Sequence, residues 1–275
     1  MSFAMESSMV DRARSTGWLV FRLSTLELWR NPLGMVLLVV IPTVFIAMIV
    51  WTAGKGSLPL KLYFGEEVVE VLLTQRQTAL VFVCAAVSGF LAAYYALILF
   101  HNDLGYFRFC AFMGLSPIVF TLARFAAFLL VTSLLAAITA IGLGYVTPLE
   151  QPPLVFAGFL LITVIYGAYG GIVGVLSRSF MPALLLIVLL ADLDAAWLQN
   201  PVYYSAAQES AVIQWLPAFY PCQLVFAGAF TSRGNAAALV GAATWALASV
   251  AILVLAVQLR LRGPLAAGPG GRFDQ

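Results

Sequence analysis

Long apolar segments, separated by short polar ones, make up most of this chain. Six of them are long enough to cross a hydrocarbon core of about 30 Å as helices. They cover residues 33–53, 78–100, 117–146, 154–176, 180–198 and 236–259. Hydrophobic residues are 63% of the 275 and charged residues only 9%, whereas about a quarter of the residues of a soluble domain are charged. The pattern therefore predicts an all-α polytopic membrane protein with six transmembrane helices.

The segment before the first span is amphipathic. Residues 14–30 place Trp18, Trp29 and several leucines around Arg22 and other charged residues, which is typical of a helix that lies in the membrane interface. The chain accordingly divides into an N-terminal part with this helix (1–32), a six-helix transmembrane domain (33–259) and a flexible Gly/Pro tail (260–275).

A short helix is expected between the second and third spans, over residues 101–116. Asp103 can cap a helix here, and Ser116 with Pro117 gives the N-cap and first position of the next span. Most of its surface is apolar, with Leu104, Tyr106, Phe107, Phe109 and Met113. Such a helix should lie at a membrane interface and not in a solvated loop.

Basic residues predict the orientation. Four of them (Lys55, Lys61, Arg76, Arg233) fall on one side of the six spans. Ten fall on the other: Arg12, Arg14, Arg22, Arg30, Arg108, Arg124, Arg178, Arg260, Arg262 and Arg272. Because the side richer in basic residues is the cytoplasmic one, both termini and the 101–116 helix are expected in the cytoplasm.

Two connections on the other side differ in character. Residues 54–77 include Glu66, Glu67 and Glu70 and are expected to form a solvated loop. Residues 200–233 hold three prolines among aromatic side chains. This element is too apolar for a free loop and too broken for a span, so short helices that dip into or cap the outer leaflet are expected.

Glycines and aromatic residues distinguish two of the spans. The fourth span contains Gly167, Gly170, Gly171 and Gly174, two overlapping Gly-x-x-x-Gly pairs that favour close helix packing. The second span contains Phe90, Tyr94 and Tyr95. Tyrosine hydroxyls need partners in hydrocarbon, so these side chains are expected to face protein or a wet cavity, by helix packing or at an interface.

The fifth span contains two carboxylates. Asp192 lies about 18 Å beyond Phe180 at the helical rise of 1.5 Å per residue, past the middle of the bilayer. A charge there is costly unless it meets water or a partner. Either the span breaks near Ala191 into an outward crevice, or Asp192 and Asp194 line a path.

Little in the sequence indicates catalysis. Cys84, Cys110 and Cys222 lie at different depths, and His101, the one histidine, suits a capping or interface role better than that of a base. No cluster has the spacing of a metal site, and Gly54-Lys55-Gly56-Ser57 lacks the remaining glycine of a phosphate-binding loop. No catalytic residue, metal or cofactor is therefore expected on this chain.

The order of these features, over residues 14–262, resembles the type-2 ABC exporter permeases, in their drug and antibiotic branch. The resemblance rests on four stretches: Arg30-Asn31-Pro32, Val39-Val40-Ile41-Pro42, Asp103-Leu104-Gly105 to Leu115-Ser116-Pro117, and Trp215-Leu216-Pro217-Ala218-Phe219-Tyr220-Pro221. The third is similar to the family's cytoplasmic coupling helix, although His101-Asn102-Asp103 replaces its usual Glu-Arg pair. The last is similar to the family's outer proline-aromatic element.

The resemblance implies a permease subunit that exports a small hydrophobic or amphipathic compound across the bacterial inner membrane. ATP and Mg would bind a separate ATPase subunit, and a second permease chain, identical or not, would complete the path. Residues implied to couple to the ATPase are Asp103, Tyr106, Phe107, Arg108, Phe112 and Arg22. Those implied along the substrate path are Phe90, Tyr94, Leu186, Leu189, Leu190 and Asp192.

Other functions stay open at this point. The cargo of such an exporter could equally be a lipid, a glycolipid or a polysaccharide precursor. A proton-coupled secondary transporter would use Asp192 or Asp194 as its titrating group, although no inverted repeat is evident. A membrane enzyme and an anchor that only recruits an ATPase are the remaining alternatives.

Overall fold

The computed structural model describes residues 17–101, 116–203 and 211–262. Six helices in this part are long and apolar enough to span a membrane, as predicted. They are α2 (Pro32–Thr52), α3 (Gln75–His101), α5 (Pro117–Val146), α6 (Pro152–Leu176), α7 (Phe180–Ala191) with its π-helical extension η1 (Asp192–Leu198), and α9 (Ala236–Arg262). The chain is a multi-pass membrane protein.

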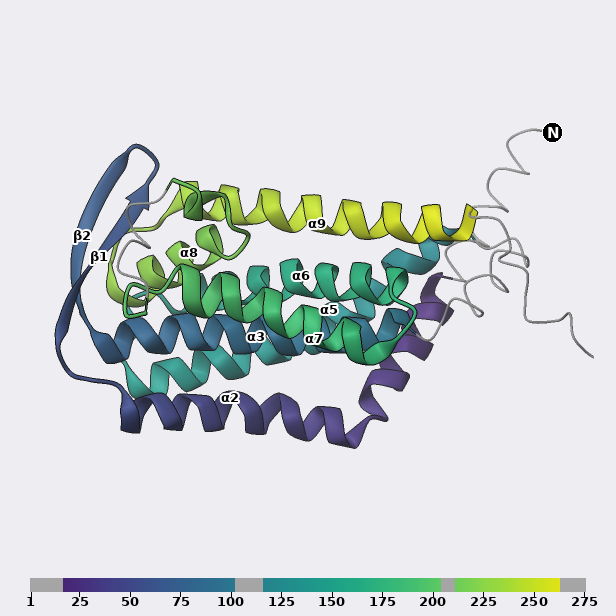
Figure 1. Ribbon diagram of the computed structural model, residues 1–275, viewed down its shortest axis with the longest axis horizontal. Helices are drawn as coiled ribbons and strands as arrows, with labels where there is room; N and C mark the ends of the chain where they lie inside the picture. Colours follow the sequence, from purple (N-terminus) through teal and green to yellow (C-terminus); the bar gives the residue numbers. More distant parts are fainter. Residues whose placement is uncertain (1–16, 102–115, 204–210, 263–275) are drawn as a thin grey trace, which may run out of the picture.

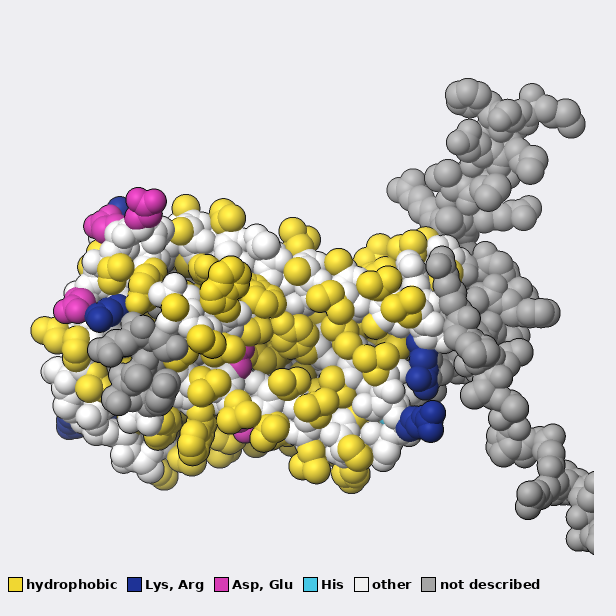
Figure 2. Space-filling model, turned by 45° about the horizontal axis from the view of Figure 1, so that its top comes forward, with side chains coloured by type: hydrophobic (Ala, Val, Ile, Leu, Met, Phe, Trp, Pro, Cys, Tyr) yellow, Lys and Arg dark blue, Asp and Glu magenta, His cyan; other side chains and the backbone are white. Residues whose placement is uncertain are grey.

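The six helices form one elongated bundle (Figure 1). Residues 17–29, which are helical, and the last turn of α9 lie at one end of it, called here the terminus end. The opposite end is called the hairpin end. In the space-filling view, hydrophobic side chains cover the middle of the molecule, and most charged ones gather near its two ends (Figure 2). That distribution is expected of a bundle that crosses a bilayer.

Glycines of α6 allow the two central helices to touch through their backbones. A Cβ atom on Gly170 would lie 2.1 Å from the carbonyl oxygen of Ala93 in α3, and one on Gly174 would lie 3.2 Å from that of Leu97. Gly167 and Gly171 face Phe128 of α5 and Leu253 of α9 instead. The predicted packing role of the Gly-x-x-x-Gly pairs is confirmed.

The connection from 54 to 77 is a β-hairpin, so the expectation of a solvated loop and of a purely helical fold is wrong here. Antiparallel strands β1 (Ser57–Phe64) and β2 (Glu67–Thr74) are joined by a two-residue turn, in which Gly65 has φ of +74°. Leu60 and Leu62 are buried on the inner face of β1. The alternation of apolar side chains favours strands here, in spite of the three glutamates. The glutamates are exposed on β2 and the turn.

The hairpin extends across its end of the bundle from α2 toward α9 (Figure 1). The outer edge of β1 is bonded by side chains. Gln223 accepts a hydrogen bond from the Tyr63 amide (3.1 Å) and donates to the Lys61 carbonyl (3.3 Å). Asn235, just before α9, donates to the Tyr63 carbonyl (2.9 Å). These bonds occupy backbone groups of an edge strand that could otherwise pair with another chain.

Two shorter helices precede α9 within the predicted 200–233 element. The 3-10 turn η3 (Ile213–Trp215) leads into α8 (Phe219–Phe230), which is apolar and buried along nearly its whole length. Helix α8 packs between α6 and α9, where Gly158 and Gly228 allow close approach to α6. The burial of most of α8 anchors the hairpin end, because β1 is bonded to this helix through Gln223.

The two predicted caps differ in detail. Asn31 caps α2, since its side chain accepts a hydrogen bond from the Gly34 amide at 3.0 Å. Ser116 occupies the N-cap position of α5, but its side chain makes no capping hydrogen bond. Pro117 at the first helical position therefore marks this start without help from the serine hydroxyl.

We predict that Gly170→Ala destabilises the protein by about 1–3 kcal/mol or more, because an added methyl group collides with the α3 backbone, which cannot move aside like a side chain. Unfolding by denaturing detergent, followed by circular dichroism, measures the effect. Gly234→Ala is the matched control, since nothing lies within 4 Å of its Cβ position. Equal stabilities of the two variants would contradict the backbone contact.

The hairpin tip should loosen in acid. Arg233 lies 2.8 Å from Glu67, and its hydrogen bond and positive charge lower the pKa of that carboxyl below its usual value of 4.5. A lowered pKa stabilises the folded form above the usual pKa, and this contribution is lost as the pH falls through the lowered value.

We therefore predict that hydrogen-exchange protection at the tip, corrected for intrinsic rates, declines in the wild type as the pH falls below 4.5, the usual pKa of this carboxyl, and through its lowered pKa. In Glu67→Gln the protection should be lower at neutral pH and should change little with pH. Glu66→Gln, at a turn residue that makes no ion pair within the described ranges, should behave like the wild type. A decline that persists in Glu67→Gln would assign the effect to another group.

Candidate functional site

Helix α3 lies in the centre of the bundle and leaves one strip partly exposed. After its first turn, every residue of α3 is buried except Val83, Phe90, Tyr94, Ile98 and His101. Their spacing of seven, four, four and three places them on one side of the helix. The two residues of α3 that the resemblance assigns to a substrate path, Phe90 and Tyr94, are therefore on its one accessible face.

The strip runs beside the start of α7. The Phe180 ring lies 6.5 Å from that of Tyr94 and 5.8 Å from that of His101, both edge to face. The Phe90 and Tyr94 rings are 6.4 Å apart. These contacts form a row of aromatic rings, here called the aromatic strip, which consists of Phe90, Tyr94, Phe180 and His101. The packing of the rings against one another holds these side chains in place.

The leucines assigned to the path lie on α7 itself. Leu186, Leu189 and Leu190 face outward, with exposed fractions of 45%, 56% and 41%. Only Ala183, Ile187 and Ala191 of this helix are buried. The structure thus brings Phe90 and Tyr94 together with α7, and leaves the three leucines on an exposed apolar face of α7.

The two aspartates of the fifth span have different surroundings. Helix α7 ends at Ala191 and continues directly as the π-helix η1 to Leu198, so the type of helix changes near Ala191 but the span does not break there. Asp192 is exposed, whereas Asp194 is buried. Of the two carboxylates, Asp192 is the one that can reach solvent or a passing molecule.

Asp194 is held by three hydrogen-bond donors from three elements. Its carboxylate accepts hydrogen bonds from the hydroxyl of Tyr166 in α6, the side-chain amide of Gln199 and the backbone amide of Ala218 before α8. No lysine or arginine of the described segments forms an ion pair with it. The three donors replace the water that the carboxylate loses on burial. This Asp194 cluster therefore ties α6, η1 and α8 together.

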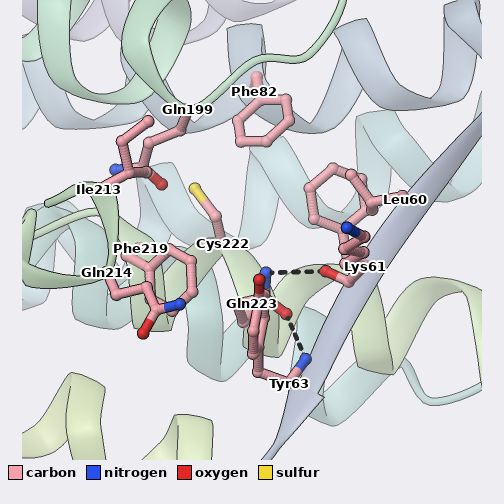
Figure 3. A pocket seen from close by; sticks show the side chains of 11 residues that line it. Leu60, Lys61, Tyr63, Phe82, Gln199, Ile213, Gln214, Phe219, Cys222 and Gln223 are labelled. Atoms are coloured by element: carbon pink, nitrogen blue, oxygen red, sulfur yellow. Dashed lines mark hydrogen bonds between the residues drawn. The ribbon is translucent and has the colours of Figure 1, made fainter. Parts of the chain in front are cut away.

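A small cavity lies beneath the hairpin, among β1, α3, η3 and α8 (Figure 3). Its volume is about 20 Å³, which suffices for one water molecule and no more. Cys222, Gln199 and Gln223 line it, and Figure 3 shows Gln223 turned toward β1, where it makes its two hydrogen bonds. This space belongs to the packing of the hairpin and has no room for a substrate.

Most of the residues expected to contact an ATPase lie outside the described part of the chain: Asp103, Tyr106, Phe107, Arg108 and Phe112. Arg22 is exposed on the helix of residues 17–29. The opposite face of that helix packs on the bundle through Val20 and Leu28. Glu27 also forms an ion pair of 3.1 Å with the buried Arg124 of α5.

The 17–29 helix is therefore joined to the third span, which begins directly after the 101–116 segment.

The sequence did not single out Tyr166 and Gln199. One signal was available for Asp194, because it continues the stripe of buried positions Ala183, Ile187 and Ala191 at helical spacing. Asp192 falls on the opposite side of the same helix. Within the described residues no group of three or more His, Cys, Asp or Glu side chains is placed to hold a metal ion.

No protein-family model matches the chain, and no curated protein matches it.

We predict that Asp194→Asn destabilises the protein by about 1–3 kcal/mol. The asparagine side chain has an NH2 group in place of one carboxylate oxygen, so a donor would then face at least one of the three groups that donate to Asp194. Asp192→Asn, two residues away and exposed, should change stability by no more than about 0.5 kcal/mol. Thermal unfolding in detergent or nanodiscs compares the two. Similar effects of both substitutions would show that the Asp194 cluster does not hold α6, η1 and α8 together.

Proposed function

We propose that this chain is the transmembrane permease subunit of an ATP-driven ABC exporter, which moves a small hydrophobic or amphipathic compound out across the bacterial inner membrane. The aromatic strip supports this most directly. Phe90 and Tyr94 lie on the one partly exposed face of a central helix. Flat apolar compounds pack well on such rings.

A second permease chain fits the same arrangement. Helices α2, α7 and α9 are each only 28% buried over their most apolar stretches, against 78% for α3. Of these, α7 lies beside the aromatic strip. In this proposal a partner chain packs on the side that carries α7, and the aromatic strips of the two chains face a shared path. Leu186, Leu189 and Leu190 then form an apolar gate, with Asp192 beyond it toward the hairpin end.

Both termini lie in the cytoplasm in this proposal, so the hairpin end faces outward and α8 is a short re-entrant element of the outer leaflet. A separate ATPase subunit binds ATP and Mg and docks under the 101–116 segment and the helix of residues 17–29. The Glu27–Arg124 ion pair supports a shared movement of that helix and α5. ATP-driven closure would then shift the spans between two packings.

Co-purification tests this function. The tagged chain is extracted gently from its native membrane, and mass spectrometry identifies what accompanies it. The proposal expects an ATPase subunit in equal amount, lost when Arg108 and Phe112 are both replaced by alanine. Trp51 and Lys55, an aromatic and basic pair at the other end of the bundle, provide the matched control, and their replacement should leave the complex intact.

The main alternative is a secondary transporter that titrates Asp192. Absence of an ATPase, together with transport that survives ATP depletion and stops in Asp192→Asn, would favour this alternative and overturn the proposal. Transport that stops on ATP depletion while the proton gradient persists would support the exporter. The nature of the co-purified lipid or cargo separates drug export from lipid, glycolipid or polysaccharide-precursor export.

A further inference from the structure

A larger cavity opens at the hairpin end, between the hairpin tip, α8 and the first turns of α9. Its volume is about 570 Å³, within the range of about 300–1,000 Å³ that is common for small-molecule sites. Tyr63, Phe219 and Tyr220 form its aromatic wall, and Ala236, Ala237 and Gly241 of α9 form a wall of small residues. It is far larger than the one-water cavity beneath the hairpin, and it is open.

The aromatic wall is fixed in place before any ligand binds. The Phe219 ring lies 5.7 Å from that of Tyr63 and 5.3 Å from that of Tyr220, the second pair nearly perpendicular. The Tyr220 ring also lies against α9, where a Cβ on Gly241 would come within 2.5 Å of it. With Ile213, these rings make a hydrophobic cluster separate from the two large cores of the bundle. A preorganised wall of this kind lowers the entropic cost of binding.

Among the described residues that line the cavity, the polar groups are few and uncharged. None of these lining residues is a lysine, arginine, aspartate or glutamate. The Gln223 side-chain amide already makes two hydrogen bonds to the backbone of β1 (Figure 3). The Gln214 amide, half-exposed at the cavity, has no hydrogen-bond partner among the side chains and backbone groups that the structure describes. It can therefore both donate to and accept from a ligand.

We propose that this cavity binds a neutral amphipathic molecule of drug size that carries at least one flat ring. The ring packs against Tyr63 and Tyr220, and a polar edge of the molecule bonds to Gln214. A charged ligand is disfavoured because none of the described residues that line the cavity carries an opposite charge. The inference does not depend on ATP-driven export, so its failure would leave the proposed function untouched.

Photolabelling tests the site. The full chain in nanodiscs is labelled with a neutral benzophenone, and peptide mapping by mass spectrometry locates the adducts. Labelling should concentrate on the segments around Tyr63, Tyr220 and Ala237. Ala236→Trp, which fills the cavity from an exposed position, should abolish it, whereas Leu239→Trp, an exposed position of α9 outside the lining, should leave it unchanged. Circular dichroism confirms that each variant is folded.

Gln214→Ala supplies an independent readout. Loss of one hydrogen bond should weaken binding roughly threefold to tenfold for a benzophenone, whose carbonyl accepts from the amide. The affinity of a diphenylmethane analogue without the carbonyl, measured as competition for labelling, should not change. Equal labelling of wild type and Ala236→Trp, or adducts confined to lipid-facing helix surfaces, would overturn the proposal and indicate simple partition into the bilayer.

Discussion

The backbone contact between α3 and α6 is the constraint on which the rest of the bundle depends. In a bilayer, lipid tails are as apolar as leucine side chains, so helices associate mainly where their surfaces fit closely. Gly170 and Gly174 bring α6 against Ala93 and Leu97. Neighbouring positions of the same helix then receive side chains from other elements, since Gly167 faces Phe128 of α5 and Gly171 faces Leu253 of α9. One glycine-rich segment thus positions three helices around α6.

The same segment determines where polar chemistry lies. Tyr166 stands one residue before Gly167, and its ring fits against Gly89 of α3. Its hydroxyl bonds to Asp194, which in turn holds η1 and the start of α8. Because α3 and α6 are locked together, the surfaces left for movement or for partners are the partly exposed strip of α3 and the weakly buried helices α2, α7 and α9. In the proposed exporter the strip and α7 line the path.

The large features of the fold could be predicted from the sequence because they depend on composition and periodicity. Six spans, the Asn31 cap and the glycine packing are all properties of a few neighbouring residues. The β-hairpin was not predicted because the three glutamates favoured the interpretation of a solvated loop. Apolar residues nevertheless recur at every second position on both sides of Gly65, as Leu60 and Leu62 before it and as Val69 and Val71 after it. Partners distant in sequence, such as Gln223 with Tyr63, cannot be read from local pattern at all.

The candidate site was predicted in part for the same reason. Phe90 and Tyr94 stand out as aromatic residues of a span, and the structure places both on the accessible strip. Asp192 and Asp194 look alike in sequence, and only the side of the helix on which each lies separates an exposed carboxylate from a buried one. The cavity at the hairpin end joins residues from β1, η3, α8 and α9, so no single stretch of sequence contains it.

The most direct test of the account is accessibility of the aromatic strip during transport. Tyr94→Cys, in a chain whose natural cysteines are replaced by serine, is exposed to a membrane-impermeant thiol reagent from each side in membranes that contain the native partners. The account predicts labelling from the cytoplasmic side without nucleotide, and loss of that labelling when ATP is trapped on the ATPase. Labelling that is absent, or unaffected by nucleotide, would contradict a path along α3.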